Sequence, residues 1–209
     1  MPPRPKRADG RRRRPRQERS RALVDAIVQA TVELAAERGL EHVSTDHIAA
    51  RAGVSVGSVY QYFASKDVAV REAIERRARA GHDAMVTQLA TIATLPLEEA
   101  IAAAVRFLVG WFAADAPAYT ELFRHVGRVT EHAAVREELD RVIFAATALL
   151  SMHRARLGGR DPALVAYVMT VACTRVVEDA LQSRAALVAD GSLERELVAL
   201  CLAFVTNAR

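Results

Sequence analysis

Residues 53–70, GVSVGSVYQYFASKDVAV, decide how this chain folds. Gly53 permits the positive φ angle of a tight turn, and Ser55 can cap a short helix that starts directly after it. Ser65 can cap the next helix in the same way. Because two caps and a glycine turn fall within so few residues, the segment predicts short helices that meet at steep angles. That arrangement is a helix-turn-helix.

The residues before this stretch supply the other helices of the same unit. Apolar residues at helical spacing predict a helix over residues 19–38. Ser44 is a natural N-cap for a helix over residues 45–52. A helix over residues 56–62 follows the turn, and a longer one opens at Lys66.

The rest of the chain predicts long helices and no strands. Apolar residues make up 51 % of the sequence, and strong helix formers dominate it. Prolines at three expected helix starts suit first-turn positions. The expected helices cover residues 66–93, 96–114, 117–128, 131–157, 162–188 and 193–206. The sequence therefore predicts an all-α protein of about nine helices.

Positive charge is concentrated at the N-terminus. Residues 1–21 hold ten cations and two acids, whereas the whole chain carries a formal net charge of +4. Residues 1–16 are rich in arginine and proline and cannot form a core, so we expect a flexible arm. Such an arm is either a solvated tail without a partner or an element that binds DNA phosphates or the minor groove.

Several chemistries have no signal in the sequence. The two cysteines, Cys173 and Cys201, lack CxxC spacing, which predicts reduced and buried thiols in a cytoplasmic protein. No histidine pair has metal-ligand spacing, and no phosphate loop or nucleophile motif appears. No stretch has the pattern of a secretory signal or the length of a membrane span. We therefore expect no enzyme activity, no cofactor, no metal and no membrane contact.

The predicted helix over residues 56–62 carries small and polar side chains where a core helix would carry apolar ones. Val59 is its apolar anchor. Small residues allow close approach to the floor of a groove, and Ser58 and Gln61 can hydrogen-bond base edges there. Tyrosine hydroxyls suit phosphate oxygens at the groove edge. Its candidate DNA contacts are Gly57, Ser58, Tyr60, Gln61 and Tyr62.

Residues 44–70, STDHIAARAGVSVGSVYQYFASKDVAV, resemble the helix-turn-helix of TetR-family transcriptional regulators. The shared elements are a hydroxyl cap, the run IA-x-x-AGVS at 48–55, the group Y-x-YF at 60–63 and the pair SK at 65–66. The resemblance covers about residues 20–75 and implies phosphate contacts from Thr45, Tyr60, Tyr62 and Lys66. The predicted DNA-binding residues are Ser44, Thr45, Ser55, Gly57, Ser58, Tyr60, Gln61, Tyr62 and Lys66, with Arg12, Arg13 and Arg14 of the arm.

The last two predicted helices, over residues 162–188 and 193–206, are candidates for a dimer interface. A single recognition helix reads too few base pairs, so helix-turn-helix proteins pair on two half-sites. Both helices are apolar around much of their circumference. A four-helix bundle between two copies, as in the resembled family, explains this, and an intrachain core is the alternative. The predicted interface residues are Val168, Ala172, Val176, Leu197, Cys201 and Phe204.

Aromatic residues interspersed with polar ones predict a ligand pocket in the C-terminal half. An apolar cavity with a few polar groups is the usual site for a small molecule. For any single aromatic residue, plain core packing is the alternative. Arg175 could pair with Asp179 or meet an anionic ligand. The candidate pocket residues are Phe107, Trp111, Phe112, Tyr119, Phe123, His125, Arg128, Tyr167 and Arg175.

These patterns predict a cytoplasmic, ligand-responsive repressor. We expect a basic arm over residues 1–18, a helix-turn-helix DNA-binding domain over 19–80, and a helical ligand-binding and dimerisation domain over 81–209. A homodimer would bind a palindromic operator and be released by a small-molecule effector. Two alternatives stay open. One is an activator or a regulator without an effector, and the other is a small-molecule-binding or catalytic helical protein whose arm binds nucleic acid unspecifically.

Overall fold

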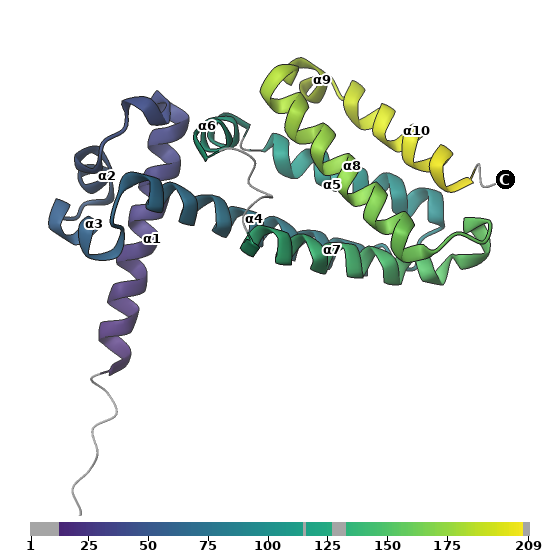
Figure 1. The fold of residues 1–209 in the computed structure, drawn as a ribbon, viewed down its shortest axis with the longest axis horizontal. Coiled ribbons are helices and arrows are strands. Elements are labelled where there is room, and N and C mark those ends of the chain that lie inside the picture. Colours follow the sequence, from purple (N-terminus) through teal and green to yellow (C-terminus); the bar gives the residue numbers. More distant parts are fainter. Residues whose placement is uncertain (1–12, 115, 127–132, 207–209) are drawn as a thin grey trace, which may run out of the picture. The chain divides into compact units, whose positions relative to one another are not determined.

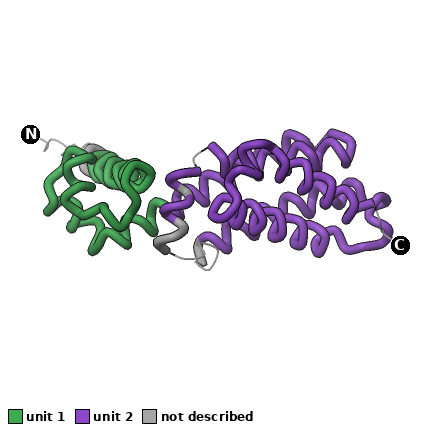
Figure 2. Tube along the Cα trace, turned by 90° about the horizontal axis from the view of Figure 1, so that it is seen from above, with its two compact units in different colours: residues 1–73 green, residues 74–209 purple. Residues whose placement is uncertain are grey.

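The computed structural model of the chain describes residues 13–114, 116–126 and 133–206. The described residues form ten α-helices and two short 3-10 helices, with no strand among them (Figure 1). This confirms the prediction of an all-α protein. The chain divides into two compact units, residues 1–73 and 74–209, and the division falls inside one long helix (Figure 2).

The first unit contains α1 (Arg13–Arg38), η1 (Leu40–His42), α2 (Thr45–Ala52), α3 (Val56–Tyr62) and the start of α4 (Lys66–Thr91). The second unit contains the rest of α4, α5 (Leu97–Ala113), α6 (Ala116–Val126), α7 (Ala133–Met152), η3 (Arg154–Leu157), α8 (Pro162–Ser183), α9 (Ala185–Ala189) and α10 (Ser192–Thr206). The helices α2 and α3 have the predicted bounds.

Several helix bounds differ from the predictions; the helix predicted over residues 131–157, for example, is α7 followed by the 3-10 helix η3. Two of the differences have local reasons. Helix α1 begins at Arg13, so part of the predicted arm is helical. Pro15 lies in its first turn, where a missing backbone N–H costs nothing because that group has no intrahelical partner. The helix predicted over residues 162–188 is two helices, because Arg184 leaves the helical conformation at φ −146°. That division accounts for ten helices instead of about nine.

The core of the first unit lies between α1, α2 and α3. Ile27 and Leu34 of α1 pack with Leu40, Ile48 and Val59 from the following elements, and each of these side chains is almost fully buried. Burying one such side chain contributes roughly 1.5–3 kcal/mol. The apolar periodicity of α1 and the single anchor of α3 therefore fix the three helices on one another.

Caps and a glycine turn set the sharp path between α2 and α3. Ser44 Oγ accepts a hydrogen bond from the backbone N–H of His47, and His47 Nδ1 accepts one from the backbone N–H of Ser44. Gly53 ends α2 with φ 68°, a conformation that costs glycine little. Ser55 Oγ caps α3 by accepting from the N–H of Ser58. The predicted helix-turn-helix is confirmed at each of these positions.

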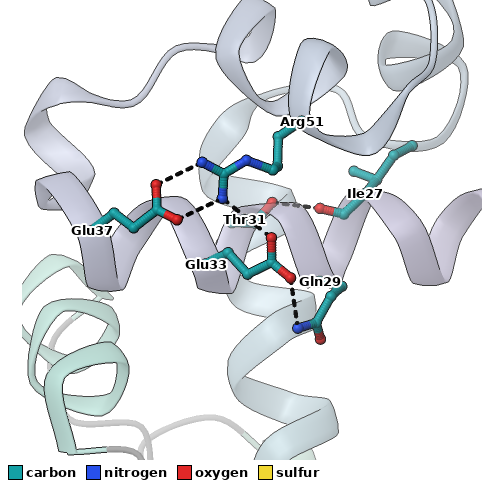
Figure 3. A network of polar contacts seen from close by, with 6 residues as sticks. All are labelled: Ile27, Gln29, Thr31, Glu33, Glu37 and Arg51. Atoms are coloured by element: carbon teal, nitrogen blue, oxygen red, sulfur yellow. Dashed lines mark hydrogen bonds and ion pairs between the residues drawn. The ribbon is translucent and has the colours of Figure 1, made fainter.

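Arg51 of α2 forms hydrogen bonds with two glutamates of α1 (Figure 3). Its guanidinium donates two hydrogen bonds to the Glu37 carboxylate, at 2.9 and 2.6 Å, and a third to Glu33 at 3.2 Å. Gln29 donates to the other oxygen of Glu33. Such a two-pronged contact fixes direction as well as distance. This cluster, which the sequence did not predict, links α2 to α1 in addition to the apolar core.

We expect Arg51→Gln to lower the free energy of unfolding near neutral pH and to have a smaller effect in acid. The hydrogen bonds from Arg51 lower the pKa of Glu37 below its usual value of 4.5. A carboxyl group with a lowered pKa contributes stability above its unfolded pKa and loses it as the pH falls through the folded value. Urea unfolding followed by far-UV circular dichroism, at several pH values, measures the difference between the two proteins.

The control for this prediction is Arg71→Gln, which removes an exposed arginine of α4. The effect of Arg71→Gln on the free energy of unfolding should not become smaller in acid. A wild-type minus Arg51→Gln difference that stays constant from neutral pH down to about pH 3 would contradict the role of Glu37.

Candidate nucleic-acid interface and ligand cavity

Helix α3 has one buried side and one exposed side. Val59 faces the core, whereas Gly57 and Gln61 are exposed and Tyr60 is 55 % exposed. A tyrosine ring at the surface offers its hydroxyl to a partner without disturbing the core. The exposed side of α3 therefore has the width and chemistry of an element that enters a major groove.

Gly57 is not required by the fold. A Cβ atom placed there would meet only Ser55 Oγ, at 3.8 Å, which is an ordinary contact. A glycine inside a helix costs roughly 0.5–1 kcal/mol relative to alanine. Since the surrounding structure accepts a larger residue, packing within the chain does not require glycine here, and the close approach to DNA that the sequence predicts for Gly57 stays a prediction.

Ser58, the predicted base contact beside Gly57, is held by the cap of its own helix. The hydroxyls of Ser55 and Ser58 lie 2.8 Å apart and share a hydrogen bond. Ser55 also accepts from the backbone N–H of Ser58. The two hydroxyl groups thus form one preorganised pair at the start of α3, with lone pairs remaining for a further donor.

Tyr62 and Lys66 make contacts inside the first unit. The Tyr62 hydroxyl donates to Ser20 Oγ of α1 at 3.1 Å. Lys66 Nζ donates to the backbone carbonyl of Leu40 at 2.7 Å. Both side chains are half-buried, so they join α3 and α4 to α1 and η1. An ammonium group carries three donors and a phenol oxygen also accepts, so phosphate contacts by these groups remain chemically compatible predictions.

The N-terminus of α2 presents a second group of polar residues. Ser44 is exposed and Thr45 is half-buried beside it. Because His47 Nδ1 accepts the hydrogen bond from Ser44, its Nε2 carries the proton when the ring is neutral. His47 is exposed and is therefore an additional donor at this helix end. The sequence pattern did not reveal it, since a capping box normally has glutamate or glutamine there.

Only part of the predicted arginine arm lies within the residues that the structure describes. Arg12 lies outside the described residues. Arg13 and Arg14 belong to the first turn of α1, but their side chains lie outside the described part of the chain. The DNA contacts predicted for these three arginines stay predictions.

The second unit contains a cavity of about 130 Å³. Helices α4, α5, α7, α8 and α10 supply its walls, which are mostly apolar. Phe107, Trp111 and Phe112, all predicted pocket residues, lie in its wall. The structure thus brings together the α5 part of the predicted pocket.

Two other predicted pocket residues lie elsewhere. Tyr167 is 53 % exposed on α8 and is absent from the cavity wall. Arg175 lies outside the wall as well, and its guanidinium pairs with Glu178 at 3.1 Å. The Asp179 carboxylate, considered as its partner from the sequence, pairs with Arg184. The side chains of Tyr119, Phe123, His125 and Arg128 lie outside the described part of the chain.

Few polar groups reach the cavity wall. Thr170, Thr174 and Glu178 enter it from α8, and His82 enters it from α4. Burial lowers the pKa of His82, which favours the neutral ring. Within the described residues, the buried His82 Nδ1 has no hydrogen-bond partner. Most of the surface of a small molecule in the cavity would meet apolar side chains.

Gly81 and Trp111 pack closely against each other in this wall. A Cβ atom at Gly81 would lie 2.5 Å from Trp111 Nε1. The indole also stacks near Phe107, with ring centroids 6.3 Å apart, and the Arg77 guanidinium lies 5.6 Å from the ring centroid. A glycine in the middle of the long helix α4 was the available sequence signal for close packing. It did not identify the partner.

Helices α8 and α10 are apolar on both their inner and outer sides. Exposed apolar side chains recur at helical spacing along α8 and α10, and Val168, Val176 and Phe204 of the predicted interface are among them. Ala172 is exposed as well. Leu197 and Cys201, by contrast, are buried inside a single chain, so they are not available to a partner. The exposed apolar residues are Leu164, Tyr167, Val168, Val176, Leu200 and Phe204.

A capped helix, a glycine turn and an exposed second helix define a helix-turn-helix DNA-binding protein. Family models agree with this class: the model of bacterial regulatory proteins of the tetR family matches residues 27–73, and a tetracyclin repressor-like C-terminal domain matches residues 96–204. The chain belongs to the TetR family. It is a DNA-binding transcriptional regulator rather than an enzyme, as the sequence predicted.

Solved structures share the fold across nearly the whole chain. A Mesorhizobium loti protein assigned to the TetR-family transcriptional regulators is 18 % identical, with a TM-score of 0.69, and the match covers 89 % of this chain and 96 % of that one. NalD of Pseudomonas aeruginosa, the secondary repressor of the MexAB-OprM multidrug efflux pump, is 20 % identical, with a TM-score of 0.64 and coverage of 91 % and 100 %. The fatty acid degradation regulator FadR of Bacillus halodurans is 20 % identical, with a TM-score of 0.61 and coverage of 84 % and 94 %.

At this level of identity, these structures show the fold alone. Among curated proteins, none matches the chain significantly. The described helices include none with the length and apolar character needed to cross a bilayer. Across the same described residues, no group of three or more histidine, cysteine, aspartate or glutamate side chains could hold a metal ion.

Proposed function

We propose that the protein is a cytoplasmic homodimeric repressor that binds a palindromic operator and is released from it by a small apolar effector. This proposal depends mainly on the exposed side of α3. There, Gly57 leaves room that the fold does not need, and Ser58, Tyr60 and Gln61 surround it with hydrogen-bonding groups. Polar groups around a small residue suit base edges and phosphates within a groove.

The outer sides of α8 and α10 support a dimer. Their inner sides already build the core of the second unit through residues such as Val165, Val177 and Val205. Large apolar residues remain on the outer sides of the same helices, and apolar patches of this kind mark interaction sites. Pairing with a second copy would bury both patches in a four-helix bundle. It would also supply two α3 helices for two half-sites, about 34–36 Å apart or a multiple of that spacing.

The cavity is the proposed binding site of the effector, and helix α4 extends from this cavity into the first unit. Lys66, at the start of α4 in the first unit, donates a hydrogen bond to the carbonyl of Leu40, while Gly81, His82 and Met85 of the same helix line the cavity. An effector that binds better to a chain arrangement unsuited to the operator shifts the population toward that arrangement. NalD and FadR regulate drug efflux and fatty acid degradation by name, which fits an apolar organic effector in this cavity.

Selection of bound sequences from random double-stranded DNA tests the operator. We expect a palindrome, bound by two chains per site in analytical ultracentrifugation, and weak competition by random DNA. Tyr60→Ala should weaken binding to all sequences, whereas Tyr167→Phe, on the proposed dimer surface, should keep the operator preference. Equal competition by random and selected DNA would contradict the proposal and favour unspecific binding by the arm.

The single tryptophan of the chain gives a direct test of the effector. Because Trp111 lies in the cavity wall, compounds that enter the cavity should change its fluorescence. We expect those compounds to release the protein from the selected operator in proportion to their occupancy. Occupancy without any change in operator affinity would indicate a regulator that this cavity does not control.

A further inference from the structure

The two cysteines of the chain meet in the cavity wall. Cys173 on α8 and Cys201 on α10 are 28 positions apart, yet their Sγ atoms lie 3.4 Å from each other. Both side chains are buried, at 5 % and 2 % exposure, and both line the cavity. The sequence predicted buried thiols, and burial is confirmed. Their pairing was not predictable, because it depends on how α8 and α10 pack.

This geometry is close to that of a disulfide. A disulfide bond is about 2.05 Å long, so small movements of the two side chains bring the sulfur atoms to bonding distance. Helices α8 and α10 contact each other directly, which holds their backbones in place. The cavity of about 130 Å³ beside the sulfur atoms gives the side chains room to rotate. A bond between them would join two helices within one chain.

The hydrogen bond between the thiols prepares one of them as a nucleophile. Either sulfur can be the donor in this contact, and the sulfur that accepts is stabilised as a thiolate. Since the thiolate is the reactive form, one thiol of the pair attacks first and the other is the resolving thiol.

We propose that Cys173 and Cys201 form a thiol-oxidation site that takes small, uncharged organic hydroperoxides from the cavity. The thiols are shielded from the surface, so an oxidant must pass mostly apolar walls to reach them. A charged oxidant would lose its hydration without a compensating partner, whereas an uncharged hydroperoxide loses little. The cavity thus selects the class of oxidant.

The reaction has two balanced steps. The thiolate of one of the two cysteines attacks the terminal oxygen of the hydroperoxide, an S–O bond forms and the O–O bond breaks. The leaving alkoxide takes the proton released by the thiol and becomes an alcohol. The second thiol then attacks the sulfur of the sulfenic acid, so that the S–S bond forms and the S–O bond breaks, and the hydroxide leaves as water with the proton of the second thiol. Two thiols are oxidised and one hydroperoxide is reduced to alcohol and water.

The regulatory consequence rests on the proposed function, because α8 and α10 are also the proposed dimer helices. Joining them by a disulfide changes their packing directly beneath the exposed apolar surface. Oxidation is therefore expected to change operator affinity. The oxidation site itself needs neither DNA nor a dimer, so the two proposals can fail separately.

The test treats the full-length, reduced protein with cumene hydroperoxide and compares it with oxidised glutathione, which is charged and bulky. After an acid quench, the protein is denatured, alkylated and analysed by mass spectrometry. We expect loss of both alkylatable thiols and a peptide cross-link between Cys173 and Cys201 with cumene hydroperoxide, and little reaction with oxidised glutathione. A disulfide between two chains, equal reaction with both oxidants, or persistent free thiols would overturn the proposal.

Single variants identify the first nucleophile. In Cys173→Ser and in Cys201→Ser, the second thiol is absent, so oxidation of the remaining cysteine should stop at a sulfenic acid that dimedone traps. The variant that forms the sulfenic acid faster retains the attacking cysteine, and no trapped sulfenic acid in either variant would contradict the proposed reaction. Operator binding measured on the same oxidised samples separates the outcomes: a cross-link without a change in DNA affinity keeps the oxidation site and overturns only its regulatory consequence.

Discussion

Gly57→Leu is expected to abolish specific operator binding while leaving the helix content unchanged. A Cβ atom at this position has only one ordinary contact, 3.8 Å from Ser55 Oγ, and the site is exposed, so the fold accepts a larger residue. A leucine side chain would hold the backbone of α3 away from the groove and separate Ser58 and Gln61 from the bases. Each lost base contact costs roughly 1–3 kcal/mol, so affinity should fall on the order of 100-fold or more.

Two matched variants distinguish this effect from general damage. Ala36→Leu places the same side chain on an exposed position of α1 and should leave operator affinity unchanged. Gly57→Ala should raise the free energy of unfolding by roughly 0.5–1 kcal/mol, because alanine favours a helix. Fluorescence anisotropy with the selected operator, together with circular dichroism, measures both properties. Operator binding by Gly57→Leu at wild-type affinity would exclude close approach of α3 to DNA.

The second large effect is a difference in the free energy of unfolding between two single variants, Gly81→Ala and Gly110→Ala. Both glycines lie inside helices, so each substitution brings the same backbone gain of roughly 0.5–1 kcal/mol. At Gly110 a Cβ atom has nothing within 4 Å, whereas at Gly81 it would lie 2.5 Å from Trp111 Nε1. The difference between the two variants therefore isolates the cost of that clash, which is roughly 1–3 kcal/mol for an overpacked core.

Urea unfolding of the two variants measures this difference, and Trp111 reports its origin. Because the indole ring is rigid, it can relieve the clash only by moving as a whole, so Gly81→Ala should displace the ring and shift its fluorescence spectrum. Gly110→Ala should keep the wild-type spectrum. Equal stabilities for the two variants, or an unchanged spectrum for Gly81→Ala, would show that the contact between Gly81 and Trp111 is looser than the structure indicates.

Local chemistry made the first unit predictable. Ser44, Gly53 and Ser55 act within a few residues of their own positions, so a cap or a positive φ angle can be inferred without knowledge of the tertiary fold. The structure confirmed the bounds of α2 and α3 for this reason. The limit of such inference appears at Arg184, where a departure from helical backbone divided one expected helix into α8 and α9.

The residues that build the cavity were predicted less completely. An aromatic residue has the same sequence signal whether it lines a cavity or faces solvent, so Trp111 and Tyr167 could not be told apart. On the apolar helices α8 and α10, the sequence could not assign inner and outer sides. Leu197 and Cys201 consequently proved to be buried within the chain, whereas Val168 and Phe204 are exposed.

By itself, the sequence determined the helical class, the capped turn and the exposed chemistry of α3, because caps, periodicity and glycine conformations act over a few residues. Only the tertiary structure decided which distant residues meet. The contacts of Arg51 with Glu37, Gly81 with Trp111, and Cys173 with Cys201 arise where helices far apart in the chain pack together. Such contacts depend on the rotation and spacing of whole helices, which no short stretch of residues sets on its own.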